Sequence, residues 1–196
     1  MGIEAAPAEI VLVSGLPRSG TSMAMRMLAA GGLEAYTDGR READSDNPQG
    51  YYEFEAVKQL KKDNSWVAAA RGKALKVISH LLTYLPAGIN YRVLFMRRSL
   101  DEVLASQAAM LQRSGKKAPS AADDAEMKAL FARHLLEIEQ WLDGQDNFVF
   151  LDVPHGGVIE DPGAWAERIS HFLGGKLDAP PMAAAVDPRL YRQRQV

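Results

Sequence analysis

A glycine-rich segment near the N-terminus has the residue types of a phosphate-binding loop. It covers residues 15–22, with the sequence GLPRSGTS, between an apolar run and a helical pattern. Backbone N–H groups at the start of the following helix would point into this loop, and the helix dipole favours an anion there. The spacing matches the Walker pattern G-x-x-x-x-G-K-[ST] except at Thr21, which takes the place of the lysine. Arg18 adds a cation that can reach a phosphate or sulfate oxygen.

The missing lysine decides which phosphate chemistry this loop predicts. That lysine bridges the terminal phosphates of ATP, so its absence weakens an ATPase or kinase interpretation. The alternative is an ordinary glycine-rich turn between a strand and a helix. The strand–loop–helix context favours anion binding, with Arg18, Ser19, Gly20, Thr21 and Ser22 as the binding residues.

A second candidate anion site lies further along the chain. Arg98 ends an apolar strand pattern, and Ser106 follows it by eight residues on a predicted helix. Ser99 and Ser106 are about two helical turns apart, so they share one side of that helix. An arginine guanidinium can bind two phosphate oxygens at once. The alternative makes Arg98 a surface charge and Ser106 a tolerated helix serine; together with the loop, the pair favours phosphate binding.

Alternating strand and helix patterns must position these residues. Short apolar runs predict strands over 10–13, 74–78, 92–96 and 148–153. Apolar spacing and end signals predict helices over 19–30, 52–63, 99–113 and 161–173, and a long one from Ser120 to about Leu142. Ser99 and Glu102 match the capping-box pattern, and residues from 179 onward are less regular. The sequence therefore predicts a three-layer α/β/α fold, P-loop NTPase-like, with a mainly parallel sheet.

Composition narrows the class of protein. The 196 residues are 47% hydrophobic and 24% charged, with a net charge of −2. This predicts one domain over 1–196 and excludes disorder and a strongly basic nucleic-acid-binding protein. The absence of cysteine excludes thiolate catalysis, and four histidines argue against a histidine-rich metal site, so we expect no metal. The sequence has no apolar run long enough to span a bilayer and no signal peptide, so we expect a cytoplasmic protein with no membrane span. A homo-oligomer stays open.

Both motifs resemble those of sulfotransferases, which use 3′-phosphoadenosine 5′-phosphosulfate (PAPS). The run PRSGTS is similar to the family's 5′-phosphosulfate loop, which also has a hydroxyl residue in place of the Walker lysine. Arg98 and Ser106 have the spacing of the family's 3′-phosphate segment, although Leu100 and Glu102 replace its proline and aspartate. The resemblance implies PAPS as the sulfuryl donor, held by these two motifs.

Three residues are candidates for the chemistry of transfer. Lys76 resembles the lysine of the family's Lys-Thr-His strand, but His80 stands four residues on rather than two. A histidine before two leucines is also commonly structural or exposed. Glu53 ends the long polar loop over 34–52, a substrate-side segment, and resembles a glutamate found after an Asn-Pro-x-Gly stretch in some bacterial relatives; its alternative is a helix-start carboxylate. The general base is therefore open between Glu53 and His80.

The leading hypothesis is a sulfotransferase-like enzyme that transfers a sulfuryl group from PAPS to a hydroxyl or amine. The acceptor, a small molecule, glycan or peptide, cannot be identified from the sequence. One alternative is a P-loop small-molecule kinase or nucleotide hydrolase, which predicts dependence on Mg²⁺. The other is a nucleotide-binding module without turnover.

Overall fold

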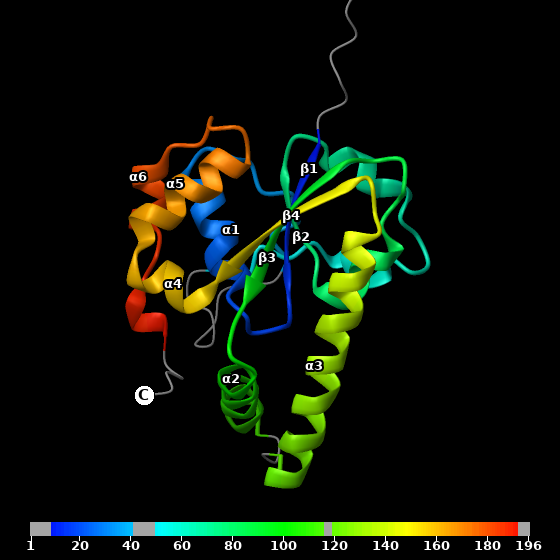
Figure 1. The fold of residues 1–196 in the computed structure, drawn as a ribbon, viewed down its shortest axis with the longest axis vertical. Coiled ribbons are helices and arrows are strands. Elements are labelled where there is room, and N and C mark those ends of the chain that lie inside the picture. The colour runs from blue at the N-terminus through cyan, green and yellow to red at the C-terminus, as the bar shows by residue number, and fades with distance from the viewer. Residues whose placement is uncertain (1–8, 41–49, 116–118, 192–196) are drawn as a thin grey trace, which may run out of the picture.

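Four parallel strands form the sheet at the centre of the molecule. The computed structural model describes residues 9–40, 50–115 and 119–191 (Figure 1). Within them the strand order is β2-β1-β3-β4. The strands are β1 (Ile10–Gly15), β2 (Ala74–Lys76), β3 (Tyr91–Arg97) and β4 (Phe148–Pro154). The parallel sheet predicted from the sequence is confirmed, although β2 ends two residues before the predicted end.

Helices cover both faces of this sheet. On one face lie α1 (Thr21–Ala30), α4 (His155–Glu160), α5 (Pro162–Phe172) and α6 (Ala179–Ala184) (Figure 1). On the other lie α3 (Ala121–Asp143) and the 3₁₀ segments Glu55–Gln59, Ser65–Ala70 and Ser79–Tyr84. Each face of the sheet packs against its own hydrophobic core. Side chains alternate along a strand, so successive residues of β1 pack into one core and then the other. The three-layer α/β/α architecture is confirmed.

The remaining helix, α2 (Leu100–Arg113), lies beyond the carboxyl end of β3 and beside α3 (Figure 1). Several helix ends follow the predicted signals. Gly31 follows the last residue of α1, and the Asp161 side chain accepts a hydrogen bond from the Ala164 amide at the start of α5 (2.9 Å). In the part of the chain that the structure describes, no helix has both the length and the apolar content to cross a bilayer.

Two predictions about helices are wrong. The segment 52–63 is not an α-helix, since only a 3₁₀ segment at Glu55–Gln59 forms there. Its apolar residues Phe54, Val57 and Leu60 are spaced by three, which is the period of a 3₁₀ helix. In the C-terminal region, α6 forms where less regular structure was expected, with Met182 fully buried against the α1 side of the core.

Candidate functional site

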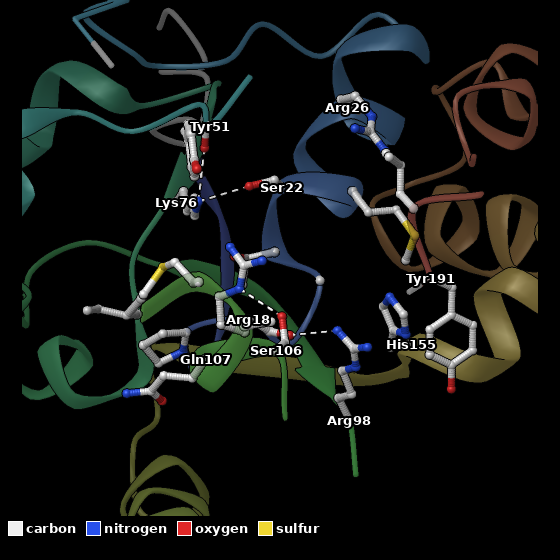
Figure 2. Close-up of a pocket in the computed structure, with 18 of the residues that line it drawn as sticks. Arg18, Ser22, Arg26, Tyr51, Lys76, Arg98, Ser106, Gln107, His155 and Tyr191 are labelled. Carbon is white, nitrogen blue, oxygen red and sulfur yellow. Dashed lines mark hydrogen bonds between the residues drawn. The ribbon is translucent and has the colours of Figure 1, made fainter. Parts of the chain in front are cut away.

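A pocket of about 440 Å³ lies at the carboxyl ends of the strands, where α/β sheets commonly bind ligands (Figure 2). The loop after β1, the end of β2, α2, the start of α4 and the C-terminal segment all contribute to it. Among the predicted site residues, those that line it are Arg18, Gly20, Thr21, Ser22, Glu53, Lys76, Arg98 and Ser106. Sequence segments far apart in the chain therefore meet at one cavity.

The loop between β1 and α1 has a backbone conformation that depends on glycine. Gly20, which precedes α1, has φ of +103°, and a Cβ there would lie 2.6 Å from Cδ2 of His155. A Cβ at Gly15 would lie 2.7 Å from the carbonyl oxygen of Met96. Arg18 has φ of +70°, a strained value of the kind found at functional sites. Both glycines of the motif are thus required by the fold of the loop.

This loop leaves hydrogen-bonding groups that an anion could use. The Ala24 amide donates to the Gly20 carbonyl at 3.2 Å, and the amides before it belong to the first turn, which has no intrahelical acceptors. Ser19 is 1% exposed, and its hydroxyl has no hydrogen-bond partner among the described residues. Buried polar groups are normally paired, and the helix dipole favours negative charge at this end. The loop can therefore hold a phosphate or sulfate group.

Two hydrogen bonds join the loop to the second motif. Arg18 Nε donates to the Ser106 hydroxyl at 3.0 Å, and Arg98 Nη1 donates to the Arg18 carbonyl oxygen at 3.0 Å. Ser106 is 7% exposed. Figure 2 shows Arg18 of the loop next to Ser106, with Arg98 beside them. Arg18, Arg98 and Ser106 thus form one hydrogen-bonded part of the pocket lining.

Glu102 holds Arg98 from its other side. Its carboxylate accepts a hydrogen bond from Arg98 Nε at 2.9 Å and another from the Tyr191 hydroxyl at 2.6 Å. The Arg98 guanidinium also lies 5.3 Å from the centre of the Tyr191 ring. The predicted capping box is therefore wrong: the Ser99 side chain caps no helix amide, and Glu102 bonds to Arg98 and Tyr191 instead. A buried carboxylate is tolerable here because it is paired on both oxygens.

His155 packs between the loop and Tyr191. Its ring meets the Tyr191 ring edge-on, with centroids 4.9 Å apart. Burial, and then the positive charge of Arg98, lower the pKa of His155 to about 4, so the ring is neutral at pH 7. Its Nδ1 is buried and has no hydrogen-bond partner in the described part of the chain. A polar atom of this kind can serve a bound ligand.

Of the three candidate catalytic residues, Lys76 and Glu53 lie together in the pocket and His80 lies apart from them. Lys76 Nζ donates to the Tyr51 carbonyl at 2.9 Å and to the Ser22 hydroxyl at 3.1 Å, and lies 3.6 Å from Glu53 Oε1. His80 is exposed and does not line the pocket. Partial desolvation and the nearby His134 lower the pKa of His80. The structure thus brings Lys76 and Glu53 together beside the loop but does not bring His80 to them.

The electrostatic character of the pocket suits a polyanion. Its basic lining residues are Arg18, Arg26, Lys76, Arg98 and Arg113, against the acidic Glu53 and Asp187. An apolar part is lined by Ile78, Met110 and Phe131. The described residues contain no cluster of three or more acidic or histidine side chains arranged to hold a metal ion. A basic cleft of this kind raises the local concentration of anionic ligands.

Sequence reasoning missed Arg26, His155 and Tyr191. Arg26 follows Ser22 by four residues on α1, so the helical spacing could have placed it on the same face. No comparable signal exists for His155 or Tyr191, because tertiary packing alone brings them to Arg98 and Gly20. Of the predicted substrate-side loop 34–52, residues 41–49 lie outside the described residues.

No protein-family model and no curated protein matches this chain. Among solved structures, it is similar to the sulfotransferase STF1 from Mycobacterium tuberculosis H37Rv, with a TM-score of 0.55 and 16% identity over 91% of this chain and 71% of that one. It is also similar to the sulfotransferase domain of the Synechococcus PCC 7002 olefin synthase (TM-score 0.53, 18% identity, covering 100% and 91%). A third is the sulfotransferase domain from the curacin biosynthetic pathway (TM-score 0.53, 14% identity, covering 95% and 90%). At these identities the comparison establishes a sulfotransferase-like fold.

Proposed function

We propose that this chain is a sulfotransferase that uses PAPS to sulfate a hydroxyl or amine. The observation that carries the proposal is the pair of hydrogen bonds joining Arg18 to Ser106 and Arg98 to the Arg18 carbonyl. They put a helix-start anion site and a second arginine–serine site around one pocket. This arrangement suits a nucleotide that carries anionic groups on both its 5′ and 3′ positions, and the sulfotransferase-like fold supports it.

The residues present fit such a donor. The loop amides with Arg18, Ser19, Gly20, Thr21 and Ser22 would hold the 5′-phosphosulfate, in a cradle where a Cβ on Gly20 would clash. The unpartnered Ser19 hydroxyl supports the same assignment. Arg98 and Ser106 would hold the 3′-phosphate, since the arginine fork matches phosphate oxygens.

Chemistry then depends on charge and on one proton. When bound, PAPS would supply the sulfuryl group: its S–O bond to the 5′-phosphate would break, with the electron pair left on the phosphate oxygen, as sulfur bonds to the acceptor oxygen or nitrogen. Lys76 and Arg18 would offset the negative charge that develops on that phosphate. Glu53 would take the proton of the acceptor, and Lys76, 3.6 Å away, would orient its carboxylate.

Ligand-induced thermal shifts test the donor. We expect adenosine 3′,5′-bisphosphate to raise the melting temperature of the wild type, and Mg·ATP to raise it less. Arg98→Ala should abolish the shift, because a charge-assisted contact to the 3′-phosphate is lost. Arg133→Ala, which removes an arginine that is 69% exposed on α3, is the matched control and should keep the full shift. A preference for Mg·ATP would instead support a P-loop kinase or hydrolase and overturn the proposal.

Turnover assays test the base. Glu53→Gln should lower kcat by about 10²- to 10⁴-fold while the bisphosphate still binds, as expected on losing a general base. His80→Ala should turn over like the wild type, because His80 lies outside the pocket lining. The measurement is transfer of labelled sulfate to a panel of alcohols, phenols and amines. Loss of activity in His80→Ala alone would move the role to His80, and absence of any transfer would leave a nucleotide-binding module.

A cytoplasmic location and a single domain over 1–196 remain part of the proposal, which leaves the oligomeric state open. So does the class of acceptor, whether small molecule, glycan or peptide.

A further inference from the structure

Arg26 lines the pocket and makes no hydrogen bond or ion pair with any residue that the structure describes. It lies on α1, four residues after Ser22, and therefore on the same face of the helix (Figure 2). Its guanidinium makes no hydrogen bond or ion pair with a described residue, and its Nε is completely buried. Burial lowers the pKa of Arg26, an effect that Tyr52 and Asp187 partly offset. A buried charged donor without an acceptor requires an explanation.

The other pocket cations with recorded bonds differ from Arg26. Arg18 donates to Ser106, Arg98 donates to Glu102, and Lys76 donates to the Tyr51 carbonyl. Asp187, whose negative charge raises the pKa of Arg26, accepts no hydrogen bond from it. Asp187 accepts from Arg189 on both of its oxygens, at 2.9 Å each, and forms no ion pair with Arg26. Arg26 is therefore the described pocket arginine positioned to receive an external anion.

The position of Arg26 points to the acceptor rather than to the donor. Arg18, Arg98 and the loop amides already provide for the anionic groups of the nucleotide. Tyr52, the residue directly before Glu53, raises the pKa of Arg26 and has a strained φ of +52°. Arg26 and Tyr52 also both line a second hollow between α1 and the segment Ala184–Asp187. Arg26 thus lines both the main pocket, which Lys76 and Glu53 also line, and this second hollow.

We propose that Arg26, with Tyr52 beside it, binds an oxyanion on the acceptor, so that the acceptor is an acid as well as an alcohol, phenol or amine. Four residues of helix separate Arg26 from Ser22, a rise of about 6 Å, and Ser22 contacts Lys76 at the reacting centre. The acceptor's nucleophile and its anionic group should therefore lie about one helical turn apart. A guanidinium binds carboxylate and sulfonate groups alike. This inference rests on the proposed function.

The experiment uses matched probes on protein saturated with adenosine 3′,5′-bisphosphate. Calorimetric titrations compare 4-hydroxybenzoate and 4-hydroxybenzenesulfonate with the uncharged 4-hydroxybenzyl alcohol. We expect the wild type to bind at least one of the two acids more tightly than the alcohol. In Arg26→Gln the affinity for that acid should fall by about tenfold or more, as for a lost hydrogen bond to a charged group, while the alcohol is unaffected. Arg26→Lys should recover part of the lost affinity. Arg133→Gln, which removes an exposed arginine outside the pocket, is the control and should lose no affinity for the acid.

Two results would overturn this inference while leaving the donor assignment intact. One is an acid-to-alcohol preference that is absent in the wild type or unchanged in Arg26→Gln. The other is a loss of bisphosphate affinity in Arg26→Gln, which would assign Arg26 to the nucleotide. Failure of the bisphosphate to bind the wild type would instead refute the proposed function, and it is measured first in the same titration.

Discussion

Glu102 and Tyr191 hold in place Arg98, the arginine that we propose binds a phosphate. Glu102 is 5% exposed and bonds to both of the other two residues. The carboxylate removes part of the positive charge of Arg98 and in return fixes the direction of its guanidinium. A buried pair of this type contributes geometry more than net stability, and the loss of one partner is costly. Tyr191 is therefore a positioning residue for the second anion site.

Tyr191→Phe tests that role because it removes only the hydroxyl. The variant leaves one Glu102 oxygen without its 2.6 Å hydrogen bond, so the carboxylate should shift and take Arg98 with it. We expect the affinity for adenosine 3′,5′-bisphosphate to fall by about tenfold and that for adenosine 5′-monophosphate to stay the same. Fluorescence or calorimetric titration measures both. Tyr84→Phe, outside the pocket lining, is the control; an equal loss for both nucleotides would indicate general loosening instead.

At the residue scale, the sequence predicted residues that the structure brings to one pocket where those residues belong to a short motif. Arg18 and Gly20 are two residues apart, and Ser106 on α2 follows Arg98 by eight residues. Tyr191 could not be predicted from a motif, because Glu102, to which it donates a hydrogen bond, is 89 residues away in the sequence. Glu102 was misassigned since its spacing from Ser99 fits a capping box equally well, and only the fold shows that it turns to Arg98.

Among the elements, the turn from β1 into α1 sets the site. Arg18 and Gly20 of this turn have positive φ, and His155 at the start of α4 packs against Gly20. The shape of the anion cradle thus depends on two elements, not on the loop alone.

Gly20→Ala should disrupt this element. An alanine at φ of +103° is strained, and its Cβ would lie 2.6 Å from His155, so we expect a loss of about 1–3 kcal/mol of unfolding free energy. The thermal shift with adenosine 3′,5′-bisphosphate should disappear. Gly88→Ala, where a Cβ would meet no atom within 4 Å, is the matched control for chemical denaturation and for binding. Full bisphosphate binding by Gly20→Ala would contradict the assigned loop geometry.

Helices and strands were predicted accurately where the spacing of apolar residues fits one type of element only. The helix at 120–142 and the strands of β1, β3 and β4 have clear signals and formed as α3 and the sheet. The segment around Val57 and Leu60 was misread because a spacing of three fits either helix type over one or two turns. α4 escaped notice since two adjacent glycines, Gly156 and Gly157, disfavour a helix that packing of Val158 then stabilises.

For the molecule as a whole, His155 links the pocket to global stability. Its pKa is about 4 in the folded protein against an ordinary value of 6.5. Between these values the unfolded chain binds a proton that the folded chain does not, so stability is complete above pH 6.5 and falls as the pH drops toward 4. The full effect corresponds to about 3 kcal/mol.

His155→Gln should flatten this dependence. Urea unfolding of the wild type and the variant at several values between pH 4 and 7 measures it, and the difference between the two proteins isolates His155. That comparison is needed because partial burial also lowers the pKa of His80 and of His134. His171→Gln, on the exposed side of α5, is the control. Parallel pH profiles for wild type and His155→Gln would rule out the assigned coupling.

The two hydrogen bonds between the motifs also constrain how such a protein can change over generations. Arg98 anchors the carbonyl of Arg18, a residue with φ of +70°, and Arg18 in turn holds Ser106. Loss of Arg98 removes the hydrogen bond to the Arg18 carbonyl, and loss of Arg18 removes the hydrogen bond to Ser106, so a substitution in either segment removes a contact with the other. We expect the two segments to be inherited or abandoned together, which makes their joint presence a better marker of descent than either alone.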